Sequence, residues 1–184
     1  MTSETIINNF MNFGCLMDAL NYHIRGIRHL DKRFPTLLAP FNITPKVFTC
    51  YRIICLNPGA KINYDQLSEP FRSWSLSTEG CKQYVKNSYC SRETMLVYQA
   101  KITGFNLLEL TDEIIRSFDN FLSSLSSDFL TKCPEWSHDD INETIKLYGH
   151  IKNFRDRPES MLNNEQEVIS LQVDDYVLFD EIKE

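Results

Sequence analysis

The chain holds one Glu-x-Glu motif, formed by Glu165 and Glu167. On a β-strand, where side chains alternate between the two faces, both carboxylates point to the same face. Like charges at that separation raise the pKa of one group, so one carboxylate can stay ionised beside a developing cation while the other exchanges a proton. Two solvated carboxylates on an exposed strand face are the alternative that the motif alone leaves open.

Two serines and one arginine could also do chemistry. Ser75 and Ser77 alternate with Trp74 and Leu76, so a strand places both hydroxyls on one face, where they can orient a carboxylate or bind a sugar. Arg52 lies in an apolar run, and burying its guanidinium is costly unless an anion meets it. The alternatives are a polar strand face for the serines and an internal salt bridge for the arginine.

Short β-rich runs predict the strands that position these residues. The predicted strands cover 49–56, 71–77, 94–102, 165–173 and 175–182. An acidic turn at Asp174 and Asp175 is expected to separate the last two of them.

Helical spacing of apolar residues predicts the remaining elements. The first 40 residues are expected to be helical and to be closed by Pro35 and Pro40. A second helix is predicted from Asp112 to Leu130, with Thr111 as its N-cap.

A third helix is predicted to open at a capping box formed by Ser137 and Asp140, with Ile141, Ile145 and Tyr148 on one side. The segment 149–164 that follows is interpreted as a loop. Its Arg155 and Arg157 either suit an acidic partner surface or are solvated loop charges.

Length and composition favour one folded domain over residues 1–184. Hydrophobic residues make up 42% and charged residues 24% of the chain, close to globular averages. The formal net charge of -6 disfavours binding to nucleic acid or to an anionic membrane, and no apolar run is long enough to span a bilayer. Neither the six cysteines nor the four histidines have the spacing of a zinc site, so we expect no metal and reduced thiols in a cytoplasm.

In chain order, Tyr51-Arg52, the run from Ser73 to Ser77 and the Glu165-Gln166-Glu167 motif resemble the Arg, Ser-x-Ser, Glu-x-Glu pattern of arginine-type mono-ADP-ribosyltransferases. The resemblance is closest to the small bacteriophage enzymes that modify host proteins, and it covers about residues 49–182. It implies an α+β fold with a split pair of small, mostly antiparallel sheets and N-terminal helices. Residues 1–45 would form the helical part and residues 49–182 the NAD-binding catalytic core.

The resemblance also implies a role for each site residue. Glu167 would stabilise the oxocarbenium-like state formed when NAD loses nicotinamide, and Glu165 would act on the acceptor arginine. Ser75 would help to hold Glu167 and Ser77 would support the strand. Arg52 would bind the phosphate side of NAD.

Three further positions are compared with the family pattern. Cys81 and Tyr84 stand where the family tends to place a small residue and an aromatic, and Tyr84 would contribute to NAD binding. Ile53 replaces a common glycine whose backbone contacts the nicotinamide, so the pocket would be narrower. The partner would be a target protein that carries an acceptor arginine, in a host bacterial cytoplasm. Hydrolysis of NAD by water and a catalytically silent binding module are the alternative functions.

Overall fold

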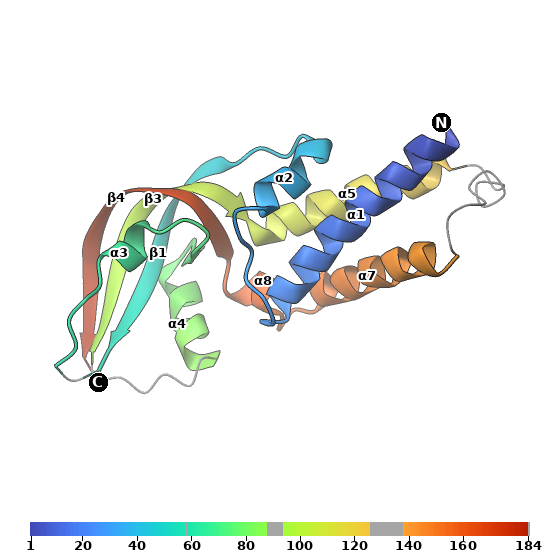
Figure 1. Cartoon of the computed structure of the whole chain (residues 1–184). Helices are drawn as coiled ribbons and strands as arrows, with labels where there is room; N and C mark the ends of the chain where they lie inside the picture. The colour runs from blue at the N-terminus through green and yellow to red at the C-terminus, as the bar shows by residue number, and fades with distance from the viewer. Residues whose placement is uncertain (58, 88–93, 126–137, 184) are drawn as a thin grey trace. The chain divides into compact units, whose positions relative to one another are not determined.

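The structure is a computed structural model that describes residues 1–57, 59–87, 94–125 and 138–183 (Figure 1). The chain belongs to the α+β class, as predicted, and divides into two compact units. Residues Met1–Ile43 and Leu110–Arg157 form a helical unit, and residues Thr44–Glu109 and Pro158–Glu184 form a sheet unit. One junction between the units falls between Ile43 and Thr44, and residues 110–157 group with the N-terminal helices.

Helix α1, Ser3–Ile24, begins the helical unit, and the hydroxyl of Thr2 accepts a hydrogen bond from the Thr5 N–H at 3.2 Å. The predicted helix over 40 residues is interrupted after Ile24, because Gly26 adopts a left-handed φ of 66°. The two prolines begin short helices instead of closing the region. Those helices are α2, Phe34–Leu38, and the 3-10 helix η1, Ala39–Phe41.

Helix α5 runs over Leu107–Ser124, five residues earlier than predicted. The side-chain oxygen of Asn106 accepts the Glu109 N–H at 2.9 Å, whereas the expected cap Thr111 is fully buried inside the helix. Residues 126–130 of the predicted helix lie outside the described residues. The apolar face is confirmed, because aromatic rings of α1 and α5 pack edge to face in one core; these are Phe10, Phe13, Phe118 and Phe121.

Helix α7 covers His138–Asp156, so the loop predicted for 149–164 is wrong over 149–156 and is present only over 157–160. Ser137 of the predicted capping box lies outside the described residues. Gly149 does not end the helix, because the buried Ile151 holds the following turn in the core. A side chain at position 149 would meet only open space. Ile141 is buried as predicted, but Ile145 is 41% exposed. A short helix, α8, follows at Met161–Asn164.

The sheet unit contains strands β1, Lys46–Leu56, β2, Ser73–Ser75, β3, Thr94–Asn106, and β4, Glu167–Lys183. All pairs are antiparallel, and the order β1-β2-β4-β3 closes because β3 also pairs with β1. Within the described residues this is one closed four-stranded sheet, where the resemblance implied a split pair. Helix α3, Asp65–Ser68, precedes β2, and helix α4, Thr78–Asn87, follows it.

Strand β4 is continuous through Asp174 and Asp175, so the predicted turn between two strands is wrong. Asp175 has a φ of 50°, and the register against β3 shifts between Gln99 and Lys101. Asp174 stays paired with Lys101, and the bulge lies at Asp175 and Tyr176, because β3 pairs with β4 on both sides of them.

The core of the sheet unit lies on one face of these strands. Cys50 of β1, Trp74 of β2, Tyr98 of β3 and Val168 of β4 are buried together, and Leu67 of α3 packs against them. Because strand side chains alternate, the residues next to these in sequence point to the opposite face. Ser73, Ser75 and Glu167 therefore share that opposite face.

Candidate active site

Strand register brings the serine and glutamate motifs together. Ser75 is paired with Tyr51 on one side and with Glu167 on the other, so the three residues form one row across β1, β2 and β4. Directly opposite residues in an antiparallel pair have Cβ atoms about 4.5–5.5 Å apart. A hydroxyl motif and a carboxylate motif separated by 90 residues thus share one small area of the sheet.

The described hydroxyl contact of the Glu167 carboxylate comes from Ser73. Ser73 Oγ donates a hydrogen bond to Glu167 Oε1, and Glu167 is only 5% exposed. The resemblance assigned this task to Ser75, two residues later. A buried carboxylate that accepts a hydrogen bond from a hydroxyl group has a fixed orientation. Ser73 therefore positions the Glu167 side chain in this structure.

Ser75 holds the turn that precedes β4. Its hydroxyl donates to the backbone carbonyl of Glu165 at 2.7 Å and accepts the N–H of Ser77 at 3.3 Å. The Leu76 N–H donates to the Gln166 carbonyl at 3.1 Å, so β2 and this turn are joined twice. Ser75 therefore fixes the backbone of the Glu-x-Glu motif, not its carboxylates, in the contacts described.

The two glutamates do not lie on one regular strand. Strand β4 begins at Glu167, Glu165 is in the preceding turn, and Gln166 has a left-handed φ of 50°. Both glutamates are nevertheless buried, at 9% and 5% exposure, while Gln166 is exposed. The motif is therefore not the solvated strand face that was its alternative reading.

Ser77 belongs to the helix that follows β2. Its hydroxyl accepts the Gly80 N–H at 3.1 Å, the arrangement of an N-cap serine, and its carbonyl accepts the Cys81 N–H at 3.3 Å. The strand predicted for 71–77 is shorter for this reason.

Gly80 is a site residue that sequence reasoning missed. An ideal Cβ at Gly80 would lie 2.2 Å from Ser75 Oγ and 2.5 Å from the Glu165 carbonyl oxygen. Helix α4 can therefore approach β2 and the Glu165 turn only because this residue has no side chain. The contact is non-local, and the glycine three residues after an N-cap serine was its one sequence signal.

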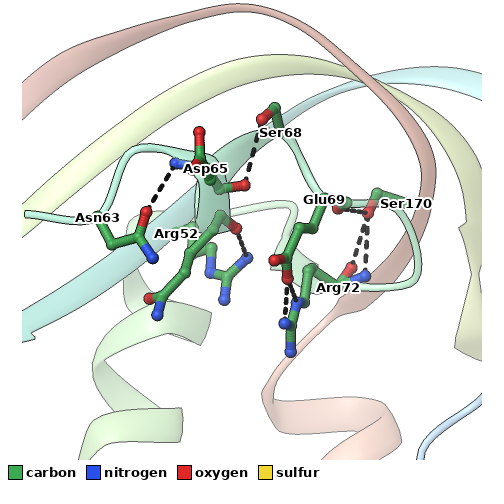
Figure 2. A network of polar contacts seen from close by, with 8 residues as sticks. Arg52, Asn63, Asp65, Ser68, Glu69, Arg72 and Ser170 are labelled. Carbon is green, nitrogen blue, oxygen red and sulfur yellow. Dashed lines mark hydrogen bonds and ion pairs between the residues drawn. The ribbon is translucent and has the colours of Figure 1, made fainter.

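Arg52 lies near Trp74, on the core side of β1. Its Nη1 donates to the Gln66 carbonyl at 3.0 Å (Figure 2), and its guanidinium carbon is 6.0 Å from the centre of the Trp74 ring. The printed contacts of Arg52 are therefore a backbone carbonyl of α3 and an aromatic face, and not the internal salt bridge that was its alternative interpretation. Burial, followed by the neighbouring charge of Arg72, lowers the pKa of Arg52, and Tyr84, Glu69 and Cys81 oppose this shift.

Arg72 forms the second cation of this region. Its guanidinium is bonded to the Glu69 carboxylate, and its backbone N–H donates to Ser170 Oγ at 3.1 Å. Figure 2 shows the guanidinium group of Arg52, a residue of β1, and that of Arg72, which follows α3, extending in the same direction. Two neighbouring guanidinium groups with one carboxylate leave a local excess of positive charge.

Cys81 of α4 connects the arginine to the serine row. Burial raises the pKa of its thiol to about 11, while the Ile53 N–H, the Ser75 hydroxyl and the Arg52 charge oppose the shift. The backbone N–H of Ile53, the position where the family often has glycine, therefore donates to sulfur here. Tyr84, one turn further along α4, is 54% exposed and lies close enough to affect the pKa of Arg52.

Arg155 lies in a helix, whereas Arg157 is in the non-helical stretch that follows it. Arg155 is in α7 and its Nε donates to Asp112 Oδ1 of α5 at 2.5 Å, an ion pair inside the helical unit. Arg157 is the last residue of that unit. The expected loop therefore contains Arg157 but not Arg155.

The described residues contain no group of three or more His, Cys, Asp or Glu that could hold a metal ion. In the same part of the chain, no helix is long and apolar enough to cross a membrane. Comparisons with protein-family models, with curated proteins and with solved structures find no match.

Proposed function

We propose that the protein is a mono-ADP-ribosyltransferase that transfers ADP-ribose from NAD to arginine side chains of target proteins. The observation that carries this proposal is the buried Glu167 carboxylate, held by the Ser73 hydroxyl and aligned with Ser75 and Tyr51 across three strands. An oriented, mostly dehydrated carboxylate is the group that stabilises an oxocarbenium-like state best.

The two glutamates would act on different reactants. The bond between nicotinamide and ribose breaks with its electron pair on nicotinamide, and Glu167 faces the positive charge left on the ribose. A guanidinium nitrogen of the acceptor then bonds to the ribose carbon and loses a proton, which Glu165 accepts. The hydrogen bond from Ser75 to the Glu165 backbone keeps this second residue beside the first.

The cationic region near α3 fits the diphosphate of NAD. Arg52 and Arg72 are close enough for one charge to lower the pKa of the other, and a bound dianion would relieve that repulsion. Trp74 beside them has a buried indole N–H without a hydrogen-bond partner among the described residues. The two guanidinium groups favour an anionic ligand beside Arg52, on the face of β1 and β2 opposite to that of Glu167, so they support anion binding but not a position of the diphosphate next to Glu167.

A single experiment tests the proposal. The purified full chain is incubated with labelled NAD and a bacterial lysate, and modified peptides are mapped by mass spectrometry. We expect ADP-ribose on arginine in reactions with the wild-type chain. Glu167→Gln keeps the size of the side chain but loses its charge, so both labelling and nicotinamide release should fall by about 10² to 10³.

Glu165→Ala separates this function from its rivals. Protein labelling should disappear while slow nicotinamide release continues, because Glu165 acts on the acceptor only. Nicotinamide release without any labelled protein from the wild type would identify an NAD hydrolase. Absence of NAD binding in calorimetry would instead identify a silent binding module.

The partner and compartment follow from the same proposal. The acceptor would be an arginine on a protein of the host bacterial cytoplasm. The buried thiols of Cys50 and Cys81 are not part of a disulfide, which suits a reducing compartment.

A further inference from the structure

Three side chains that only donate hydrogen bonds lie together in the sheet unit. Arg52 of β1 and Trp74 of β2 are on the core side of their strands, opposite to Glu167, and the Arg52 guanidinium carbon is 6.0 Å from the centre of the Trp74 ring. Arg72 comes directly before β2, and its guanidinium group extends in the same direction as that of Arg52 (Figure 2). These three residues are called the arginine-tryptophan cluster below.

Arg52 has no counter-ion within ion-pair distance among the described residues. It is half-buried, and its contacts in that part of the chain are the Gln66 carbonyl, at 3.0 Å, and the Trp74 ring. Burial, followed by the charge of Arg72, lowers the pKa of Arg52, and the opposing effect of Glu69 is smaller than that of Arg72. A guanidinium in such surroundings gains when an anion binds to it.

The Trp74 indole provides independent evidence for a ligand. Trp74 is 2% exposed, and its Nε1 is the one buried side-chain polar atom in the described ranges that has no hydrogen-bond partner. A buried donor that stays unpaired costs free energy, so a ligand that supplied an acceptor would remove this cost. The missing partner therefore lies in the same cluster as the unpaired charge.

Arg72 is held by a carboxylate but keeps part of its guanidinium available. Its Nε and Nη2 both donate to Glu69 Oε2, and Nη1 has no contact with any residue that the structure describes. A guanidinium has five N–H donors, so pairing along one edge leaves donors along the other. Glu69 thus fixes the direction of Arg72 and at the same time competes for its charge.

The donors indicate the class of the ligand. All three side chains offer N–H groups only, so the ligand must supply acceptors and negative charge. A terminal phosphoryl group has three strong acceptor oxygens and close to two negative charges at pH 7, which gives one oxygen for each donor. Each phosphate of NAD has two free oxygens and one charge, and NAD with its ribose at Glu167 would lie on the opposite face of the strands.

We propose that the arginine-tryptophan cluster binds the terminal phosphoryl group of a phosphate monoester, separately from NAD. Arg52 and Arg72 donate to two of the oxygens. The Arg52 side chain moves from the Trp74 ring toward the anion, and the Trp74 N–H donates to the third oxygen. This site goes beyond the proposed transferase activity, and its binding is measured without NAD and without a target protein.

The test titrates the full chain with methyl phosphate and dimethyl phosphate, followed by calorimetry and NMR. Methyl phosphate should bind saturably and shift the indole N–H signal of Trp74. Dimethyl phosphate, which has two free oxygens and one charge, should bind about tenfold more weakly or worse. A saturating concentration of NAD should leave the affinity for methyl phosphate unchanged.

Two substitutions in one ion pair should change the affinity in opposite directions. Arg72→Gln should weaken methyl phosphate binding about tenfold, whereas Glu69→Gln removes the competing carboxylate and should strengthen it. A general loss of folding cannot produce both results. Arg116→Gln and Glu113→Gln break a matched ion pair with the same spacing on α5, and both should leave binding unchanged.

Two further probes identify the source of the phosphoryl group. Tighter binding of ribose 5-phosphate than of N-acetyl-phosphoserine amide indicates a sugar phosphate, and the reverse order indicates a phosphorylated side chain; either order supports the site. Equal binding of methyl and dimethyl phosphate, or unweakened binding in Arg72→Gln, would overturn the proposal. Displacement of methyl phosphate by NAD would also overturn it and would make the two arginines part of the NAD site.

Discussion

Polar side chains differ in burial and in hydrogen bonding between the two units. In the sheet unit, Ser75, Glu167 and Ser170 are buried, and their described hydrogen bonds join strands and turns that are distant in sequence. In the helical unit, aromatic rings form the core, while Asp18 and Glu143 line an open groove between α1 and α7 without partners among the described residues.

Because of this difference, we expect substitutions of these polar groups in the sheet unit to change stability strongly and substitutions in the groove of the helical unit to change it little. Where polar groups are held by strand register and close backbone contact, a substitution moves the groups that we propose to be catalytic and weakens the fold at the same time. Where they line a groove on an aromatic scaffold, a substitution leaves the scaffold intact. Matched substitutions in the two units test this contrast.

Gly80→Ala should have the largest effect on stability. The added methyl group would overlap Ser75 Oγ and the Glu165 carbonyl, so we expect a loss of roughly 3 kcal/mol in the free energy of unfolding. Gly149→Ala is the matched control in the helical unit. A Cβ there meets nothing, so it should stabilise α7 by about 1 kcal/mol. Urea unfolding measures both, and an unchanged Gly80→Ala protein would contradict the close approach of α4.

The sequence predicted where the strands lie better than which hydroxyl meets which carboxylate. Alternation and β-branched residues are local signals, so β1 and β3 were found within a few residues of their bounds. The choice between Ser73 and Ser75 depends on the pairing of β2 with β4, a non-local register that no single segment contains. The contact of Gly80 with the Glu165 turn is hidden for the same reason.

Two errors have a different physical cause. Residues 149–156 were interpreted as a loop because a glycine and many polar residues suggested one, yet Ile151 keeps that turn in the core. The two aspartates of β4 resembled a turn in isolation, but pairing with β3 outweighs that local preference and produces a bulge.

Ser73→Ala tests which serine positions the catalytic carboxylate. Loss of the hydrogen bond to buried Glu167 should lower the transferase rate about tenfold, with little change in NAD affinity. Ser77→Ala removes the α4 cap instead and should lower stability by about 1 kcal/mol while the rate per folded molecule stays constant. A larger loss of rate for Ser77→Ala than for Ser73→Ala would show that the later serines of the motif, and not Ser73, position the Glu167 carboxylate.

Arg155→Ala should act on the helical unit alone. Its ion pair with Asp112 is partly exposed and joins α5 to α7, so the expected loss is below about 1 kcal/mol. A double-mutant cycle with Asp112→Ala isolates the coupling, and it should vanish at high salt. A large fall in target labelling without any change in stability would show that Arg155 contacts the target after all.

Asp18→Asn should have the smallest effect on stability, and the direction of that change is what tests the prediction. Because the pKa of Asp18 is raised in the folded chain, the folded state binds this proton more tightly than the unfolded state, so stability falls as pH rises above about 4. Removing the charge should therefore make the protein slightly more stable than wild type at pH 7, and the difference should disappear at pH 3. Melting temperatures over this range measure it. A less stable Asp18→Asn protein at pH 7 would mean that the Asp18 carboxylate already has a favourable partner within the protein.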